Sequence, residues 1–172
     1  IALIGALSAF RTLAMTCQVV PTPTHLVGLV AEQGACGSPT GITTARLWRT
    51  PRAYDPSGVS LTLSPPLPGT PFVLAGGFSL KSWGDYPAAQ LWELDASGAQ
   101  VGLHFLVVQL STWKAWRIDP RPNSGIHGDA WTITDDTFYF GENDGTPQDS
   151  TYVRRMVRVQ LTELASFAKA LN

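Results

Sequence analysis

Short stretches in which apolar and polar residues alternate make up most of the sequence after about Thr43. Residues 59–63 alternate strictly and end just before a pair of prolines, which cannot donate hydrogen bonds to a neighbouring strand. Residues 72–80 carry their largest apolar side chains at alternate positions, so one face of this stretch is strongly apolar. This period of two predicts a β-strand at both places.

A β-hairpin is predicted between residues 89–94 and 101–108, which flank the turn sequence Asp95-Ala96-Ser97-Gly98. Gly98 suits such a turn because glycine adopts a positive φ without strain. The second strand is apolar at both odd and even positions. A strand with two apolar faces lies centrally in a sheet or is covered on both sides.

Further short strands are predicted at residues 131–133, 138–140 and 153–161, the last two separated by a turn sequence. Thr162 then suits the N-cap of a short C-terminal helix. The apolar stripe of that helix would comprise Leu164, Phe167, Ala168 and Leu171. Seven or more strands with two marginal helices predict a mainly β protein, built as an antiparallel β-sandwich.

The first 42 residues differ in pattern from the rest. Residues 1–20 are apolar and read as helical or extended, whereas residues 21–41 are rich in proline and glycine, as in a connection. We therefore expect an N-terminal apolar arm or helix with its connection over residues 1–42. A β-sandwich domain is expected over residues 43–172, with the boundary near Gly41.

The apolar run at residues 1–10 is followed by Arg11 and is shorter than the roughly 20 residues of a membrane-spanning helix, so no span is expected. Two interpretations remain open: the end of a secretory apolar region, or a helix with apolar side chains at helical spacing. An ordered apolar helix is buried in its own core or against another subunit, and we favour the subunit contact. The interface candidates are Leu3, Leu7 and Phe10.

The charged residues nearly balance, with 12 Lys and Arg against 13 Asp and Glu and a net charge of −1. Nucleic acid is therefore not an expected partner, because phosphate binding requires a clustered positive field. Cys17 and Cys36 lack the spacing of a zinc site. They form either a disulfide or two buried free thiols, and the sequence leaves both alternatives open.

Four stretches carry a pattern found in one group of β-sandwiches. Residues 66–78 read as an entry strand after a proline loop, and residues 91–98 as a hairpin tipped by Asp and Gly. Residues 138–141 read as a late strand, and residues 157–163 as a closing strand with a helical tail. Together they resemble the concanavalin-type jelly-roll sandwiches, in particular the laminin-G-like modules of bacterial surface proteins and phage particles. The resemblance implies a jelly roll over about residues 43–172 and an extracellular or virion location.

Hydrolytic relatives within that broad fold, the laminarinase-type glycosidases, carry their catalytic carboxylates in a Glu-x-Asp-x-x-Glu strand motif. Here the stretch begins as Glu93-Leu94-Asp95 but ends at Gly98, so the second catalytic carboxylate is absent. A Gly-x-Ser-x-Gly nucleophile motif is absent from the sequence as well, and His104 lies inside an apolar strand, as a satisfied core or interface histidine does. We therefore expect neither an enzyme activity nor a cofactor.

Oxygen-rich turns offer weak candidates for calcium binding, namely Asp135, Asp136, Glu142 and Asp144. Their spacing does not match the twelve-residue helix-loop-helix pattern. Asp and Asn are also common in turns for purely structural reasons. The expectation is therefore no metal, with calcium as the weaker alternative.

The six tryptophans are the most suggestive functional signal, because indole rings bind the apolar faces of sugars and also anchor protein interfaces. The candidates for glycan contact are Trp83, Tyr86, Trp113, Trp116 and the loop residue His127. We expect a non-catalytic structural or adhesive subunit of an extracellular or virion (phage-like) assembly, which contacts other copies of itself or other subunits. A lectin-like carbohydrate-binding module is the alternative, and a glycoside hydrolase is a distant third.

Overall fold

The structure is a computed structural model that describes residues 15–31, 45–52, 62–64, 72–74, 80–97, 99–120, 131–142 and 155–171. Within these ranges the chain forms thirteen β-strands, one 3-10 helix and one short α-helix. Every strand pairing in them is antiparallel. The mainly β, antiparallel class predicted from the alternation is confirmed.

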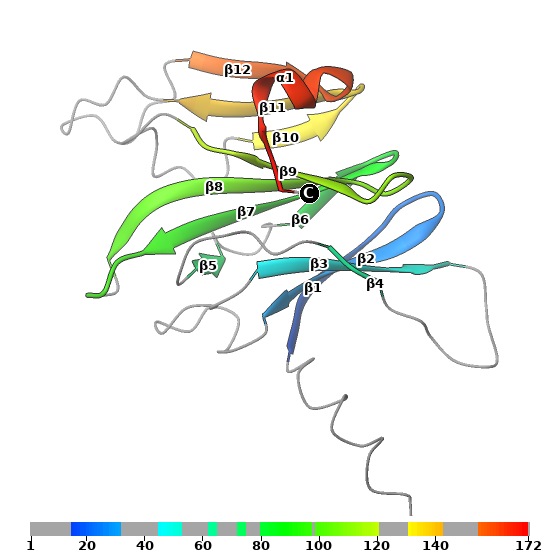
Figure 1. Cartoon of the computed structure of the whole chain (residues 1–172), viewed down its shortest axis with the longest axis horizontal. Helices are drawn as coiled ribbons and strands as arrows, with labels where there is room; N and C mark the ends of the chain where they lie inside the picture. The colour runs from blue at the N-terminus through cyan, green and yellow to red at the C-terminus, as the bar shows by residue number, and fades with distance from the viewer. Residues whose placement is uncertain are drawn as a thin grey trace, which may run out of the picture.

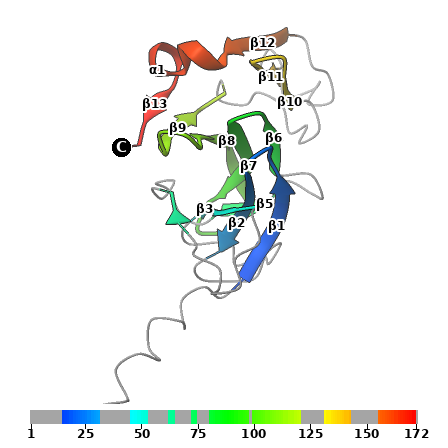
Figure 2. The ribbon, with the colours of Figure 1, turned by 90° about the vertical axis from the view of Figure 1, so that its right-hand side faces the viewer.

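Three sheets lie one above another, and we call them the upper layer, the central sheet and the lower layer (Figures 1 and 2). The lower layer has the order β1 (Met15–Pro21), β2 (His25–Ala31), β3 (Ala45–Pro51) and β4 (Thr62–Leu63). The upper layer has the order β10 (Trp131–Thr134), β11 (Thr137–Glu142) and β12 (Arg155–Gln160).

The central sheet is the largest of the three. Its order is β13 (Lys169–Ala170), β9 (Lys114–Ile118), β8 (Gln100–Gln109), β7 (Tyr86–Leu94) and β5 (Phe72–Leu74). β6 (Leu80–Trp83) pairs with β7 as well. The predicted hairpin is confirmed as β7 and β8, which pair along most of their length with one register shift beside Glu93. Gly98 lies outside the described residues.

β8 lies in the middle of the central sheet and is buried on both faces. Phe105 and Val107 contribute to the core under the upper layer, whereas Leu106 and Val108 contribute to the core over the lower layer. Successive residues of a strand point to opposite faces, so one strand supplies two hydrophobic cores. The expectation that this strand is covered twice is therefore confirmed.

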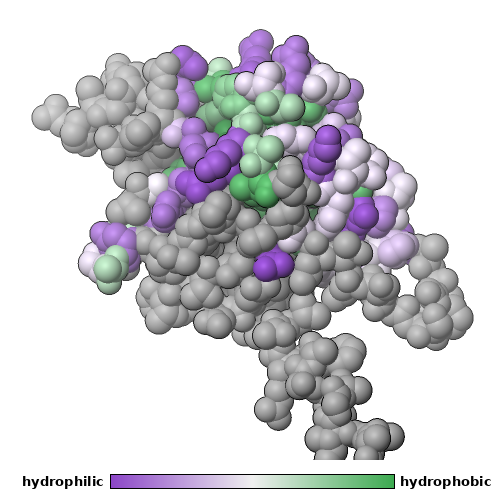
Figure 3. Space-filling model, in the orientation of Figure 1, coloured by the Kyte–Doolittle hydropathy of each residue, from purple (hydrophilic) through white to green (hydrophobic). Residues whose placement is uncertain are grey.

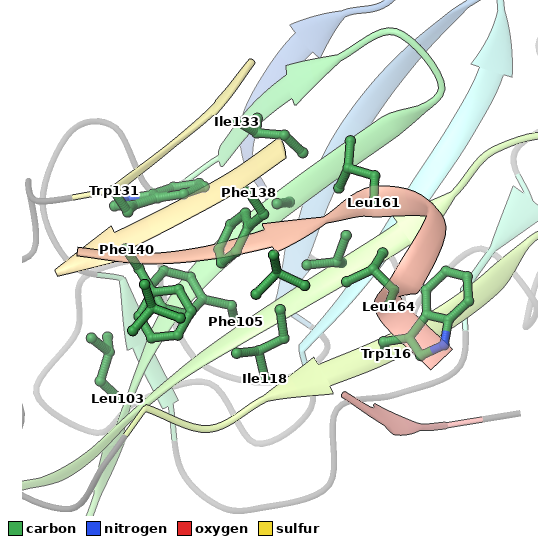
Figure 4. Packing of buried hydrophobic residues seen from close by; sticks show 14 of the residues in the cluster. Leu103, Phe105, Trp116, Ile118, Trp131, Ile133, Phe138, Phe140, Leu161 and Leu164 are labelled. Atoms are coloured by element: carbon green, nitrogen blue, oxygen red, sulfur yellow. The ribbon is translucent and has the colours of Figure 1, made fainter. Parts of the chain in front are cut away.

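The upper core, between the central sheet and the upper layer, is rich in aromatic residues (Figure 4). The ring centroid of Phe105 lies 5.4 Å from that of Trp131, 5.0 Å from that of Phe138 and 5.5 Å from that of Phe140. Tilted and edge-to-face arrangements such as these suit the quadrupole of the rings. The other buried members are Ala88, Trp92, Leu103, Val107, Trp116, Ile118, Ile133, Val157, Val159, Leu161 and Leu164.

The lower core, between the central sheet and the lower layer, is aliphatic. Its buried members are Val27, Leu29, Leu47, Leu80, Ala89, Leu91, Leu106, Val108, Leu110 and Ala115. Burial of each large aliphatic side chain stabilises the fold by about 1.5–3 kcal/mol. The two cores share no side chain, because the central sheet separates them.

β2 corrects the expectation that residues 21–41 are a connection. It pairs with β1 on one side and with β3 on the other, and Gly28 lies opposite Trp48. The Trp48 indole covers Gly28 so closely that a Cβ at position 28 would overlap the ring. Glycine therefore fits inside this strand, although in the sequence pattern a glycine indicates a turn or the end of a strand. The pairing of β2 with β3 also joins residues from both sides of the expected boundary near Gly41.

The expectation of a C-terminal helix capped by Thr162 is corrected as well. η1 (Leu161–Glu163) and α1 (Leu164–Phe167) form only brief helical turns, and Thr162 lies inside η1, whose N-cap is Gln160. β13 then pairs with β9, so the chain returns from the upper layer to the central sheet. Leu164 belongs to the upper core but Leu171 packs against the lower core, and one helical stripe could not reach both.

Hydrogen bonds of polar side chains connect the edge strand β6 to the two other layers. The Leu80 N–H donates to Oε1 of Gln18 in β1 at 2.8 Å, and the Ser82 hydroxyl donates to the carbonyl of Pro21 at 3.1 Å. On the other side, Nζ of Lys81 donates to the carbonyl of Trp131 at 2.5 Å. Because these bonds use main-chain groups that edge strands leave unpaired, they fix both layers against the central sheet.

The remaining predicted strands are present where the structure describes them. The stretches 131–133, 138–140 and 153–161 correspond to β10, β11 and β12, and the stretch 59–63 ends in β4. The stretch 72–80 begins as β5, and its last residue begins β6. No helix within the described ranges is long and apolar enough to cross a membrane.

Candidate functional site

Four charged side chains meet on the lower face of the central sheet, and we call them the charged cluster: Glu93, His104, Arg117 and Asp119. β7, β8 and β9 each contribute one of the first three, and Asp119 follows the end of β9. The cluster lies near the end of β7 and the start of β8, where Leu91 pairs with His104 and Glu93 pairs with Gly102. Each strand thus delivers its charged residue to the same end and the same face.

His104 is at the centre of the charged cluster and only 7% exposed. Its Nε2 lies 2.6 Å from Oε2 of Glu93, and its Nδ1 lies 2.6 Å from Oδ1 of Asp119. Short contacts of this kind are typical of charge-assisted hydrogen bonds. His104 is therefore a buried histidine whose two ring nitrogens both have carboxylate partners.

Arg117 completes the charged cluster from the neighbouring strand. Its Nε donates to Oδ1 of Asp119 at 2.5 Å, and its Nη2 lies 3.0 Å from Nδ1 and 3.4 Å from Nε2 of His104. Gly102, opposite Glu93, leaves the space that the imidazole needs, because a Cβ there would be 3.0 Å from Nε2 of His104. Two carboxylates, one guanidinium and a charged imidazole would together be neutral.

The pKa of Asp119 shows how strongly the charged cluster favours the ionised carboxylate. Burial on its own would raise this pKa. The hydrogen bonds from Arg117 and His104, together with their positive charge, outweigh the burial and lower the pKa below its ordinary value of 3.8. Asp119 therefore stays ionised to a lower pH than an ordinary aspartate.

The two carboxyl residues of the glycosidase-like stretch have separate roles. Asp95 Oδ1 accepts hydrogen bonds from the Ser97 N–H at 2.8 Å, the Ser97 hydroxyl at 2.6 Å and the Ala99 N–H at 3.0 Å. These bonds close the turn between β7 and β8, which is a common role of Asp. Glu93 instead bonds His104. The described residues therefore do not present Glu93 and Asp95 as a facing pair of carboxyl groups.

A second region, which we call the aromatic end, lies at the opposite end of the central sheet. Trp83 and Tyr86 are a cross-strand pair at the tip of the β6–β7 hairpin, where Gly84 has a φ of 53°. Trp83 is 41% exposed, whereas Tyr86 packs partly against the upper core. The hairpin thus presents an accessible indole beside a half-buried phenol.

Acidic residues flank this pair. Asp135 and Asp136, at the turn between β10 and β11, have positive φ values of 49° and 58°, which Asp tolerates better than most residues. Burial raises the pKa of Tyr86, and the negative charges of Asp85 and Asp136 raise it further. The β10–β11 turn therefore lies near enough to Tyr86 for its charge to be felt there.

The β8–β9 turn is attached to the same end. Asp85 accepts hydrogen bonds from the N–H of Ser111 at 3.0 Å and from its hydroxyl, and the Leu110 N–H donates to the carbonyl of Asp85 at 2.8 Å. Trp113 follows with a φ of 57°, an uncommon conformation for a bulky residue. The guanidinium of Arg49 lies 4.4 Å from its ring centroid and holds the indole against the lower layer.

The structure thus brings three of the predicted glycan-contact residues to one end and separates a fourth. Trp83, Tyr86 and Trp113 all lie at the aromatic end, in turns joined through Asp85 and Ser111. Trp116 is instead buried in the upper core, on the opposite face of the central sheet from Trp113. Trp116 lies three positions after Trp113, which is an odd number, so alternation along the chain places the two indoles on opposite faces.

Several predicted site residues lie outside the described part of the chain. These are His127, the interface candidates Leu3, Leu7 and Phe10, the weak calcium candidate Asp144, and Cys36. The side chain of Cys17, in β1, is not described either, so its pairing with Cys36 stays a prediction. The remaining calcium candidates do not come together, because Asp135 and Asp136 precede β11 whereas Glu142 ends it.

Glu142 has a structural partner. Its Oε2 lies 3.5 Å from Nε of Arg155, on the neighbouring strand. In the ranges that the structure describes, no three His, Cys, Asp or Glu side chains are arranged to hold a metal ion.

The comparisons with known proteins found no match. No family model, no curated protein and no solved structure matches the chain. The resemblance to the concanavalin-type and laminin-G-like sandwiches therefore stays a prediction that rests on the four stretches of sequence.

Proposed function

We propose that this protein is a non-catalytic structural or adhesive subunit that acts by surface contact with other copies of itself. The observation that carries the proposal is the exposure of large apolar side chains on both outer layers of the stack. Burial of apolar surface is the main favourable term in protein association, and such side chains supply it. An extracellular or virion assembly as the setting rests on the sequence resemblance alone.

One apolar patch lies on the outer face of the lower layer. Val19 and Leu26 are 49% and 38% exposed, and they are diagonal neighbours on adjacent strands. They share this face with Trp48, whose ring covers Gly28, because Gly28 pairs with Val19. Trp48 itself is only 8% exposed, so the accessible apolar surface on this face, which points away from the lower core, is that of Val19 and Leu26.

A second set of exposed apolar side chains belongs to the upper layer. Met156 in β12 is 46% exposed and Phe167 in α1 is 51% exposed. Val157 and Val159 point into the upper core, so Met156 points away from it. Figure 3 shows hydrophobic residues at the surface of the upper layer among hydrophilic ones. Two different patches on opposite outer layers favour head-to-tail contacts, which link copies without closing a dimer.

The charged cluster supports the absence of catalysis in this proposal. His104 and the carboxylates of Glu93 and Asp119 already bond to one another, and the structure puts no serine or cysteine nucleophile among those bonds. A histidine base acts by bonding the group that it activates. The third possibility, a glycoside hydrolase, would require Glu93 to leave His104 and act as the nucleophile.

The test is the molar mass of the purified chain in solution, measured by analytical ultracentrifugation over a hundredfold range of concentration. The wild type is expected to form oligomers whose size grows with concentration. Leu26→Asp and Met156→Asp should each weaken association by about tenfold or more, because each introduces a charge into one patch. Ala96→Asp, at an exposed position of the turn between β7 and β8 in the central sheet, is the control and should associate normally. A wild type that stays monomeric at every concentration would refute the proposal.

Glycan binding is a second candidate function, favoured by the cross-strand pair at the aromatic end. The exposed Trp83 indole offers a stacking surface, and the nearby carboxylates of Asp85 and Asp136 are acceptors for sugar hydroxyls. A glycan array of the wild type would identify a ligand. Trp83→Ala should then abolish binding, whereas Phe167→Ala, at an equally exposed ring elsewhere, should not. Binding that survives Trp83→Ala, or no binding to any glycan, would exclude this site as a lectin.

A further inference from the structure

The partners of His104 make two hydrogen-bond arrangements available, depending on one proton. When both ring nitrogens carry a proton, Nε2–H donates to Glu93 and Nδ1–H donates to Asp119, each across 2.6 Å. When the ring is neutral, one nitrogen becomes an acceptor and can no longer donate to its carboxylate. That carboxylate then faces a lone pair and must move away.

Arg117 decides which of the two carboxylates is released. Its Nη2 is within 3.0 Å of Nδ1 and 3.4 Å of Nε2, so it does not select one ring nitrogen, but its Nε donates to Asp119 at 2.5 Å. Asp119 therefore keeps a donor if the ring stops donating to it. Among the described residues Glu93 has no donor other than His104, so a neutral imidazole keeps its remaining proton on Nε2, toward Glu93. Asp119 is then left with the Arg117 Nε–H alone, at a side chain that is 49% exposed.

We propose that His104 is a proton-operated latch for Asp119: the charged imidazole holds Asp119, and the neutral imidazole releases it to Arg117 alone. The latch ties the end of β9 to β8 and, through Glu93, to β7. Glu93 faces His104 from β7, Arg117 faces it from β9, and Asp119 faces it from the residue after β9.

The sign of the pH effect follows from this exchange. The bond to Asp119 exists while the ring holds its second proton, so the latch is closed at lower pH and opens when a rise in pH removes that proton. In strong acid Asp119 itself becomes protonated and the ion pair is lost from the other side. The latch therefore holds over a bounded range of pH.

His25 provides an internal control. Its Nδ1 lies 2.8 Å from the hydroxyl of Thr24 rather than from a carboxylate, and it lies in β2 of the lower layer. Titration of His25 should therefore change neither Asp119 nor the end of β9. The two histidines can be followed in the same sample.

The test is an NMR titration of the full chain over the whole range of pH in which it stays folded. In the charged form both ring nitrogens of His104 should have the ¹⁵N shifts of protonated nitrogens. On titration only Nδ1 should shift to the value of an unprotonated nitrogen. The carboxyl ¹³C resonance of Asp119 should step at the same midpoint, and the Asp119 amide should exchange several-fold faster than its intrinsic pH dependence explains.

Three results would overturn the proposal. If Nδ1 keeps its proton and Nε2 loses it, Glu93 and not Asp119 is released. If the Asp119 carboxyl does not respond when His104 titrates, the two are not coupled. If His104→Gln retains the step at Asp119, or His25→Gln abolishes it, another group causes it. The first two results come from the wild type alone, so they decide the question even if the His104 variant fails to fold.

Discussion

The two faces of the central sheet are both buried against another layer, but they pack different kinds of side chain. The upper face packs rings, with Phe105 against Trp131, Phe138 and Phe140. The lower face packs aliphatic side chains and, at one end, the charged cluster. The aromatic core gains contact area and ring–ring geometry from few residues, whereas the aliphatic core leaves room for polar groups that pair with one another. The aromatic contacts therefore lie above the central sheet, and the titratable side chains of the charged cluster lie below it.

The largest effect is expected from Phe105→Ala. This change removes the ring that contacts three others and should lower the free energy of unfolding by about 4 kcal/mol. Urea unfolding followed by circular dichroism measures it. A loss smaller than about 1 kcal/mol, the scale of a mild surface change, would show that the upper core does not depend on this ring.

Leu106→Ala tests the neighbouring residue of the same strand on the lower face. The side chain is fully buried in the lower core, whose buried members are aliphatic, so the expected loss is smaller, about 3 kcal/mol. The same urea experiment compares the two variants directly. Val19→Ala, at a half-exposed position, serves as the control and should lie within about 0.5 kcal/mol of the wild type. A Leu106 variant less stable than the Phe105 variant would reverse the ranking of the two faces.

Gln90→Leu should act in the opposite direction. Gln90 is 1% exposed on the upper face, and neither its Oε1 nor its Nε2 has a hydrogen-bond partner. A buried amide without partners is destabilising, so an apolar side chain of similar size should raise the free energy of unfolding by about 1 kcal/mol. Destabilisation by the same amount would mean that the amide is bonded in solution.

Asp119→Asn should have the smallest effect, because half of this side chain is exposed and solvent screens its charge. The pKa of Asp119 is lowered in the folded state, so its ion pair stabilises the fold above the ordinary pKa of 3.8 and that stability is lost as the pH falls. The variant should therefore be less stable at neutral pH and lose less stability in acid. Unfolding midpoints in urea at about pH 7 and about pH 3 measure both differences. If the wild type and the variant lose the same stability between these two pH values, Asp119 does not cause the loss in acid.

Much of the fold could be predicted from the sequence because local alternation of apolar and polar residues indicates a strand. The hairpin of β7 and β8 and the double burial of β8 follow from side-chain parity over ten residues. β2 was missed because Gly28 and the nearby prolines are turn signals, and only the Trp48 ring of another strand explains the glycine. The terminal helix was predicted too long because pairing of β13 with β9 is a long-range contact that no local pattern contains.

The sites were less predictable for a related reason. Trp83, Tyr86 and Asp85 are close in sequence, so their grouping was visible before the fold was known. The charged cluster instead depends on the register of three strands, and Arg117 and Asp119 reach His104 only because β8 and β9 pair as they do. A signal was present in the parity of the strands: Glu93 shares its face with Leu91, His104 with Leu106, and Arg117 with Ala115.

The uneven placement of the tryptophans gives the molecule natural optical reporters of its layers. Trp92, Trp116 and Trp131 all lie in the upper core, whereas the lower layer has Trp48 alone among its described tryptophans. Intrinsic fluorescence will therefore be weighted toward the melting of the upper layer, while far-ultraviolet signals average over every strand. If the layers come apart in sequence, the two kinds of melting curve will separate, and if they fail together the curves will superimpose.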